Sequence, residues 1–225
     1  MRLGIRLKPY EGEALGGFLQ RIADRNGHSL LSFIYLMLHP SKKTLKQADI
    51  ARIDFFPKNI LDIKSIEQHL GVSLNELRQH SFWSLVSHFV DESEISSTKI
   101  MREMLRANYA YCPQCIHEYK YRKLMWNLKV ISYCPNHNLR LDEVCPHCTR
   151  TIKLMHLRDC SLCPYCSKYL GGNGKEKSNN DINIYESFIW NSVKRLQDES
   201  IQFMNNQQVA QKLIYMMMGE DQPIE

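Results

Sequence analysis

Apolar residues recur every three or four positions in the first part of the chain, which predicts a series of amphipathic helices. The first is expected over residues 13–26, where one face carries Leu15, Phe18, Leu19, Ile22 and Ala23. Gly27 predicts its C-terminal stop, and Ser29 is placed to cap a second helix over residues 30–38 that ends at His39-Pro40. A polar loop should follow, with lysines at Lys42, Lys43 and Lys46.

Residues 62–80 predict two more helices with a glycine turn between them. The first has one apolar face and ends at Gly71, and Ser73 with Glu76 forms a capping box for the second. This order is typical of a helix-turn-helix, although a helical hairpin inside a bundle has the same pattern. If the second helix reads DNA, its candidate contacts are the exposed polar side chains Asn75, Arg78, Gln79 and His80.

The remaining patterns suggest core residues, linkers and a tail. Phe82, Trp83 and Phe89 are expected in the core, and residues 91–110 are read as a linker. Residues 171–181 have the glycine-rich, polar composition of a flexible linker. In residues 182–225, apolar positions predict two short helices, first through Ile184, Phe188, Ile189, Val193 and Leu196, then through Val209, Leu213, Ile214 and Met217.

All eight cysteines lie between positions 112 and 166, and seven of them belong to four pairs of the form C-P-x-[CH]. One tight turn can direct two such ligands at a single ion, and zinc takes four ligands in a tetrahedron, so four pairs predict two sites. Sequential pairing gives a Cys₃His site and a Cys₄ site, whereas a cross-brace pairing fits the same spacing. Cys160 is the eighth cysteine and could replace Cys163. The favoured metal ligands are Cys112, Cys115, Cys134 and His137 for the first site, and Cys145, Cys148, Cys163 and Cys166 for the second.

Both sites are interpreted as structural zinc, because four protein ligands leave no position for a reactive water. A catalytic zinc, as in a hydrolase or deaminase, is the alternative, but His117-Glu118 lacks the order and spacing that a deaminase requires. No nucleophile constellation or phosphate-binding loop is present, so we expect no enzyme. Two filled sites would lower the formal net charge from +5 to about +2, which argues against a strongly basic DNA-coating protein.

The segment between the first two ligand pairs alternates aromatic and basic residues, namely Tyr119, Lys120, Tyr121, Arg122 and Lys123. Such a mixture can follow a phosphate backbone and stack on bases. It is also what a half-exposed strand beside a zinc finger looks like, so both interpretations stay open. Four apolar residues that follow should pack the finger: Trp126, Leu128, Val130 and Ile131.

Composition sets the class of protein. Hydrophobic residues make up 44% of the 225 residues and charged residues 24%, as in a globular protein. No apolar run approaches the roughly 20 residues that a membrane span needs. The charged N-terminus lacks the pattern of a secretion signal, so we expect a cytoplasmic protein with no membrane partner.

The expected fold is mostly α-helical with small zinc-binding modules. Residues 1–90 form a helix-turn-helix-like domain, 91–110 a linker, 111–170 two ribbon- or treble-clef-like zinc fingers, 171–181 a flexible linker and 182–225 a short helical tail.

Two stretches of the sequence resemble the TniQ/TnsD family of transposition target-selection proteins. Residues 6–26, with Pro9, Glu13, Arg21 and Asn26, are similar to the family's opening P-x-x-x-E-S-x-x-S-[WF]-[LI]-x-R-[LVI]-A-x-x-N. The family's two serines are here Ala14 and Gly17. The series Cys112-Pro-Gln-Cys115, Trp126, Cys134-Pro-Asn-His137, Leu141 and Cys145-Pro-His-Cys148 resembles the family's zinc block. The resemblance covers about residues 6–170.

The resemblance implies an adaptor and not a catalyst. Such a protein would select the insertion site in DNA transposition, bridging a CRISPR RNA-guided effector complex, or target DNA, to an AAA+ ATPase of the transposition machinery. Members of the TnsD kind usually carry a longer C-terminal DNA-reading region, which favours the RNA-guided kind for this chain. Some members of the family dimerise, so the resemblance leaves a homodimer open for this protein. The alternative is a stand-alone helix-turn-helix transcriptional regulator.

Overall fold

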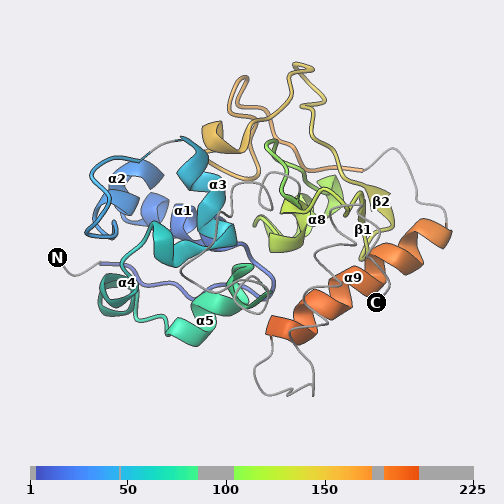
Figure 1. The fold of residues 1–225 in the computed structure, drawn as a ribbon. Coiled ribbons are helices and arrows are strands. Elements are labelled where there is room, and N and C mark those ends of the chain that lie inside the picture. Colours follow the sequence, from blue (N-terminus) through green and yellow to red (C-terminus); the bar gives the residue numbers. More distant parts are fainter. Residues whose placement is uncertain (1–3, 46, 86–103, 174–179, 198–225) are drawn as a thin grey trace.

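The computed structural model describes residues 4–45, 47–85, 104–173 and 180–197 (Figure 1). In these ranges the protein is mostly helical, with one two-stranded antiparallel sheet. The α-helices are α1 (Leu15–Arg25), α2 (Leu30–Tyr35), α3 (Gln47–Phe55), α4 (Ile63–Leu70), α5 (Leu74–Gln79), α8 (Pro113–Tyr119) and α9 (Asn180–Gln197). The 3-10 turns are η1 (Pro57–Asn59), η2 (Leu124–Asn127) and η3 (Leu154–His156), and the strands are β1 (Tyr133–Cys134) and β2 (Leu139–Arg140).

The first two helices confirm most of what the spacing of apolar residues predicts. All five predicted apolar residues of α1 are buried, and Gly27 after it has a positive φ of 72°. The Ser29 side chain accepts a hydrogen bond from the amide of Ser32 and caps α2. The predicted end of α2 at residue 38 is wrong, because the amides of Leu36 and Met37 bond to carbonyls three residues back and tighten the chain after Tyr35.

The sequence pattern does not predict helix α3, because its apolar residues do not line a face of their own. The polar loop expected from Lys42 onward leads into this helix, and Lys46 lies outside the described residues. The buried side of α3 carries two carboxylates, Asp49 and Asp54, beside its apolar residues. Asp49 accepts a hydrogen bond from Lys42 at 3.0 Å, which compensates for the burial of its charge.

The helix, glycine turn and capped helix over residues 62–80 form as predicted. Gly71 ends α4 with a left-handed φ of 66°, and Ser73 and Glu76 make both bonds of the capping box at the start of α5. The expectation that His80 is an exposed DNA contact is wrong. His80 is buried, and its Nδ1 donates to the carbonyl of Glu13 at 2.8 Å. Whether α4 and α5 read DNA stays a prediction.

Two apolar clusters form the core. One lies among the N-terminal helices α1, α2, α3, α4 and α5. The other fills the cysteine-rich part and reaches Phe82 and Trp83, which are buried as predicted; Phe89 lies outside the described residues. This cluster also includes Met104 and Tyr109, in the stretch expected to be a linker. Within the described ranges the chain from residue 104 to 110 is therefore packed, and residues 86–103 are not described.

A buried polar joint fastens α1 to the segment that follows α8. The Asp54 carboxylate accepts a hydrogen bond from the amide of Gly16 at 2.6 Å and forms an ion pair with Arg122 at 2.6 Å. The Asn127 side chain forms a hydrogen bond with each of these two charged side chains. A main-chain bond of 2.8 Å from Ala14 to Arg122 lies beside it. Arg122 is only 4% exposed, so it cannot serve the surface role considered for it from the sequence. Lys123 is buried too.

Helix α9 packs along the cysteine-rich part, beside β1 and β2 (Figure 1). Ile189 and Val193 are buried as their pattern predicts, whereas Ile184 is 72% exposed. The carboxylate of Glu186 accepts the amides of Ser132 and Tyr133 at 2.9–3.0 Å and fixes the helix in place. The second predicted tail helix lies outside the described residues. No described helix has the length and apolar character needed to cross a membrane.

Candidate metal centres

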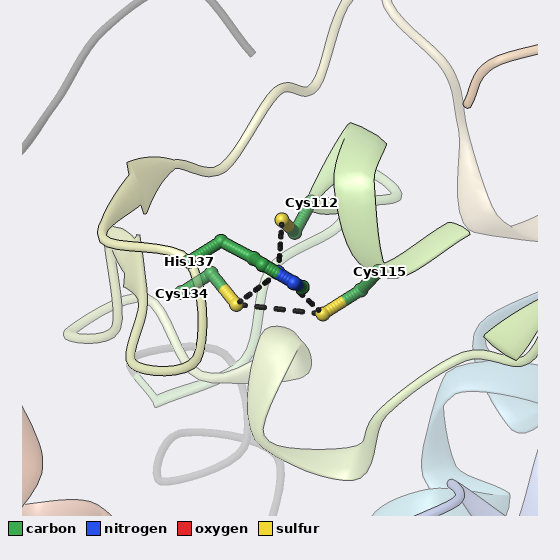
Figure 2. Close-up of side chains that lie close together, drawn as sticks. All are labelled: Cys112, Cys115, Cys134 and His137. Atoms are coloured by element: carbon green, nitrogen blue, oxygen red, sulfur yellow. Dashed lines mark hydrogen bonds between the residues drawn. The ribbon is translucent and has the colours of Figure 1, made fainter. Parts of the chain in front are cut away.

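The first centre is assembled from a helix start and a hairpin. Cys112 occupies the N-cap position of α8, Pro113 lies in the first turn, and Cys115 lies three residues after Cys112. Cys134 ends β1, and His137 lies in the turn to β2, where Asn138 has a positive φ of 53°. The hairpin register pairs Cys134 with Leu139, so this turn points His137 back at the helix. Figure 2 shows the four side chains converging on one point.

The separations within the first centre match those of a small tetrahedral ion. The Cys115 and Cys134 sulfurs lie 3.5 Å apart. The Nδ1 atom of His137 lies 3.5 Å from the sulfur of Cys112, 3.2 Å from that of Cys115 and 3.7 Å from that of Cys134. A tetrahedral ion with metal–sulfur bonds of about 2.3 Å separates its sulfurs by about 3.8 Å. The four ligand atoms could therefore hold one metal ion.

Glu118 orients the histidine of this centre. The carboxylate, on the last turn of α8, accepts a bond from Nε2 of His137 at 3.0 and 3.1 Å. That bond places the ring proton on Nε2 and leaves the Nδ1 lone pair directed at the three sulfurs. Metal-binding histidines usually donate their second ring nitrogen to a carboxylate or carbonyl in this way. The arrangement therefore fits a metal site in its outer contacts as well as in its four ligands.

The second centre consists of two equivalent turns that face each other. In one, the amide of Cys145 bonds to the carbonyl of Arg150 and the amide of Thr149 bonds back to Cys145. Cys163, Lys168 and Ser167 repeat both bonds in the other turn. The residue after each pair, Thr149 or Ser167, has a left-handed φ near 58°. The bridges Val144↔Thr151 and Leu162↔Tyr169 close the two turns in the same way.

These turns bring four sulfurs together. Cys145 lies 3.7 Å from Cys166, and Cys148 lies 3.7 Å from Cys163, so a metal ion could bind among them. Cys148 and Cys166 are partly exposed, whereas the three cysteines of the first centre are buried. The second centre is therefore the more accessible to a chelator or an oxidant.

In each centre the pKa of one cysteine is lowered, whereas the pKa values of Cys112, Cys115, Cys145 and Cys166 are raised, because neighbouring thiols and burial disfavour further negative charge. Hydrogen bonds from Cys112 and Cys115 lower the pKa of Cys134 well below its ordinary value. Burial raises the pKa of Cys163, but the amides of Tyr165 and Cys166 outweigh it and bring the pKa down to about 7. A deprotonated sulfur is the form that a metal binds.

The structure groups the eight predicted ligands in sequential order and not in the cross-brace order. Cys160 does not belong to either group. Its thiol donates to the carbonyl of Lys120 at 3.2 Å, and burial raises its pKa to about 12. Cys163 therefore occupies the place for which Cys160 was the alternative. Glu118 is not predicted by the sequence pattern, in which His117-Glu118 resembles only an incomplete deaminase motif.

The opening motif has a structural role in this fold. Glu13 is buried and forms an ion pair with Arg21 at 2.7 Å, where Glu13 leads into α1. The Asn26 side chain bonds to both the amide and the carbonyl of Ile5 and holds the N-terminal segment against the end of α1. These residues therefore fix how the chain enters and leaves its first helix.

The comparison with known families adds a match to this geometry. The family model for TniQ matches residues 4–141, which include the opening motif and the whole first centre. The match ends before Cys145, so the second centre lies beyond it. No curated protein matches the chain. The TniQ family consists of non-catalytic accessory proteins of transposition. Because the match covers more than half of the chain and includes a complete candidate metal centre, the protein belongs to the TniQ family.

Proposed function

We propose that this protein is an adaptor that selects the insertion site in DNA transposition. It would link a CRISPR RNA-guided effector complex, or target DNA, to the AAA+ ATPase and transposase of the machinery. The TniQ match over residues 4–141 is the observation that carries this proposal. The chain's role is to present several binding surfaces in fixed relation, which requires no chemistry of its own.

We further propose that both centres bind Zn²⁺ structurally, through Cys112, Cys115, Cys134 and His137 and through Cys145, Cys148, Cys163 and Cys166. Each group supplies four soft or borderline ligands, as zinc prefers, and the carboxylate of Glu118 supports the histidine. When bound, zinc would supply cross-links between short segments. One would join α8 to the β1–β2 hairpin, and the other would join the two equivalent cysteine turns.

Small zinc-bound segments need such cross-links, because they contain little regular structure. In the described ranges the only named strands have two residues each. The buried joint of Asp54, Arg122 and Asn127 then ties this part to the N-terminal helices. An adaptor built in this way can hold one partner at its helical end and another at its zinc-bound end.

Co-purification tests the adaptor. The tagged chain would be co-expressed with a transposition AAA+ ATPase and with a CRISPR RNA-guided effector, and the captured proteins would be identified by mass spectrometry. We expect both to be retained at high salt. A Cys112→Ala/Cys115→Ala variant, which lacks the first centre, is the matched control and should retain less. Capture of neither partner by the wild-type chain would contradict the adaptor proposal.

A stand-alone helix-turn-helix regulator is the second proposal. The capping box of α5 and the Gly71 turn favour it, since they set the backbone that such a unit requires. With His80 buried and the guanidinium of Arg78 lying over the Trp83 ring, the exposed contacts that α5 offers are Asn75 and Gln79. Tight, sequence-selective binding of duplex DNA by the protein alone would favour this function over the adaptor.

A further inference from the structure

Three tyrosines from two distant segments form a row on the surface. Tyr10 stacks on Tyr121 with ring centroids 5.0 Å apart, and Tyr121 lies 6.0 Å from Tyr119. Tyr10 and Tyr119, at the two ends of the row, are 49% and 47% exposed. Tyr121 is anchored through its hydroxyl, which donates to the carbonyl of Glu11 at 3.0 Å. The Arg21 guanidinium lies 4.2 Å from the centroid of Tyr10, which already stacks on Tyr121, so Tyr119 is the ring of the row that can receive a ligand.

A pocket of about 280 Å³ adjoins this row, and Tyr121 is part of its wall. Three exposed cations also line it: Arg25 from the end of α1, Lys120 from the end of α8, and Arg158. Among the described residues, none of these three side chains has an ion-pair or hydrogen-bond partner. Unpaired cations that face one cavity attract an anion.

The carboxylates in the pocket only partly offset this charge. Glu13 is already neutralised by Arg21 at 2.7 Å. Asp159 accepts two bonds from Ser161, both at 2.7 Å. Burial and the nearby charge of Asp159 raise the pKa of Asp24, so its own negative charge is disfavoured there. Three free cations thus face two carboxylates, and the balance is positive.

From this juxtaposition we infer that the tyrosine row and its cationic pocket bind single-stranded nucleic acid. Phosphates would meet Arg25, Lys120 and Arg158, and an unpaired base would stack on the exposed ring of Tyr119. A duplex hides the faces of its bases, so it cannot use the aromatic part of the surface. The inference rests on the proposed function, because it names one class of partner for that adaptor, RNA or displaced DNA strand.

Fluorescence anisotropy with labelled 12-nucleotide probes tests this inference. The probes are oligo-U, oligo-dT and a 12-base-pair duplex, measured between low and moderate salt. We expect both single strands to bind more tightly than the duplex, with an affinity that falls as salt rises. If only oligo-U or only oligo-dT binds, the source of the strand is identified. Equal or tighter binding of the duplex would overturn the inference.

Variants separate stacking from a structural role. Tyr119→Ala should weaken single-strand binding by about five-fold or more, whereas Tyr119→Phe keeps the ring and should bind like the wild type. Arg25→Ala/Arg158→Ala should also weaken binding and reduce its salt dependence. Lys64→Ala, which removes an exposed cation of α4 that does not line the pocket, is the matched control.

Each variant must keep the zinc content and melting temperature of the wild type for its affinity to count. Wild-type affinity in Tyr119→Ala, or an equal loss in Lys64→Ala, would contradict the inference. Because this assay uses the protein alone, it can fail while co-purification with the ATPase succeeds. The failure of the surface is therefore distinguishable from the failure of the adaptor proposal.

Discussion

Replacing Glu118 with alanine should weaken one zinc site and leave the other unchanged. The carboxylate accepts from Nε2 of His137 at 3.0 and 3.1 Å and is 35% exposed, so its loss frees the ring to rotate without opening a buried cavity. Loss of such an outer contact typically lowers metal affinity by about 10- to 100-fold, which corresponds to about 1.4 to 2.7 kcal/mol. The Cys₄ centre has no contact with Glu118 and provides an internal reference.

Competition with a chromogenic chelator measures this effect. The wild-type chain should release two zinc ions, and the variant should release one of them at a 10- to 100-fold lower chelator concentration. Glu118→Gln should lie between the two, since an amide oxygen still accepts the His137 proton but carries no charge. As a control, Glu11→Gln changes an exposed carboxylate that bonds to Lys194. An unchanged release profile in Glu118→Ala, or equal weakening of both ions, would refute the role assigned to Glu118.

Three further predictions concern zinc and the joint. Cys112→Ala and Cys145→Ala should each lose one zinc by elemental analysis and unfold the segment around residues 111–170, as proteolysis would reveal; retained zinc and stability would contradict the ligand assignment. Gly16→Ala should cost about 1 to 3 kcal/mol in chemical denaturation, because a Cβ would lie 2.7 Å from Nη2 of Arg122, whereas Gly4→Ala, whose nearest neighbour is 3.9 Å away, should be neutral. Arg122→Met should cost about 3 to 5 kcal/mol, since it leaves the Asp54 carboxylate buried without its partner; a loss below 1 kcal/mol would show that the pair contributes little.

Local signals predicted much of this fold. The apolar face of α1, the Ser29 cap, the Gly71 stop and the capping box each depend on residues within a few positions of one another. The repeated C-P-x-[CH] pairs likewise indicate how ligands group, because each pair is built by its own turn. Where the physical cause is local, the sequence alone was sufficient.

Features that depend on distant partners could not be predicted. Asp54 makes α3 look polar from the sequence, since the cation that neutralises its buried charge, Arg122, lies far along the chain. Arg122 looks like a surface cation until Asp54 is placed beside it. Glu118 contacts a histidine 19 positions away, and only the hairpin that carries His137 reveals the pair.

The joint between α1 and the segment after α8 also governs how the protein would transmit position. The buried Asp54–Arg122 ion pair and the main-chain bond from Ala14 to Arg122 oppose independent rotation of these parts. A partner bound to the helical end would thereby fix the orientation of a partner bound near the two cysteine-rich centres. The distance between two such partners would then be set by the size of this protein and not by the length of a flexible linker.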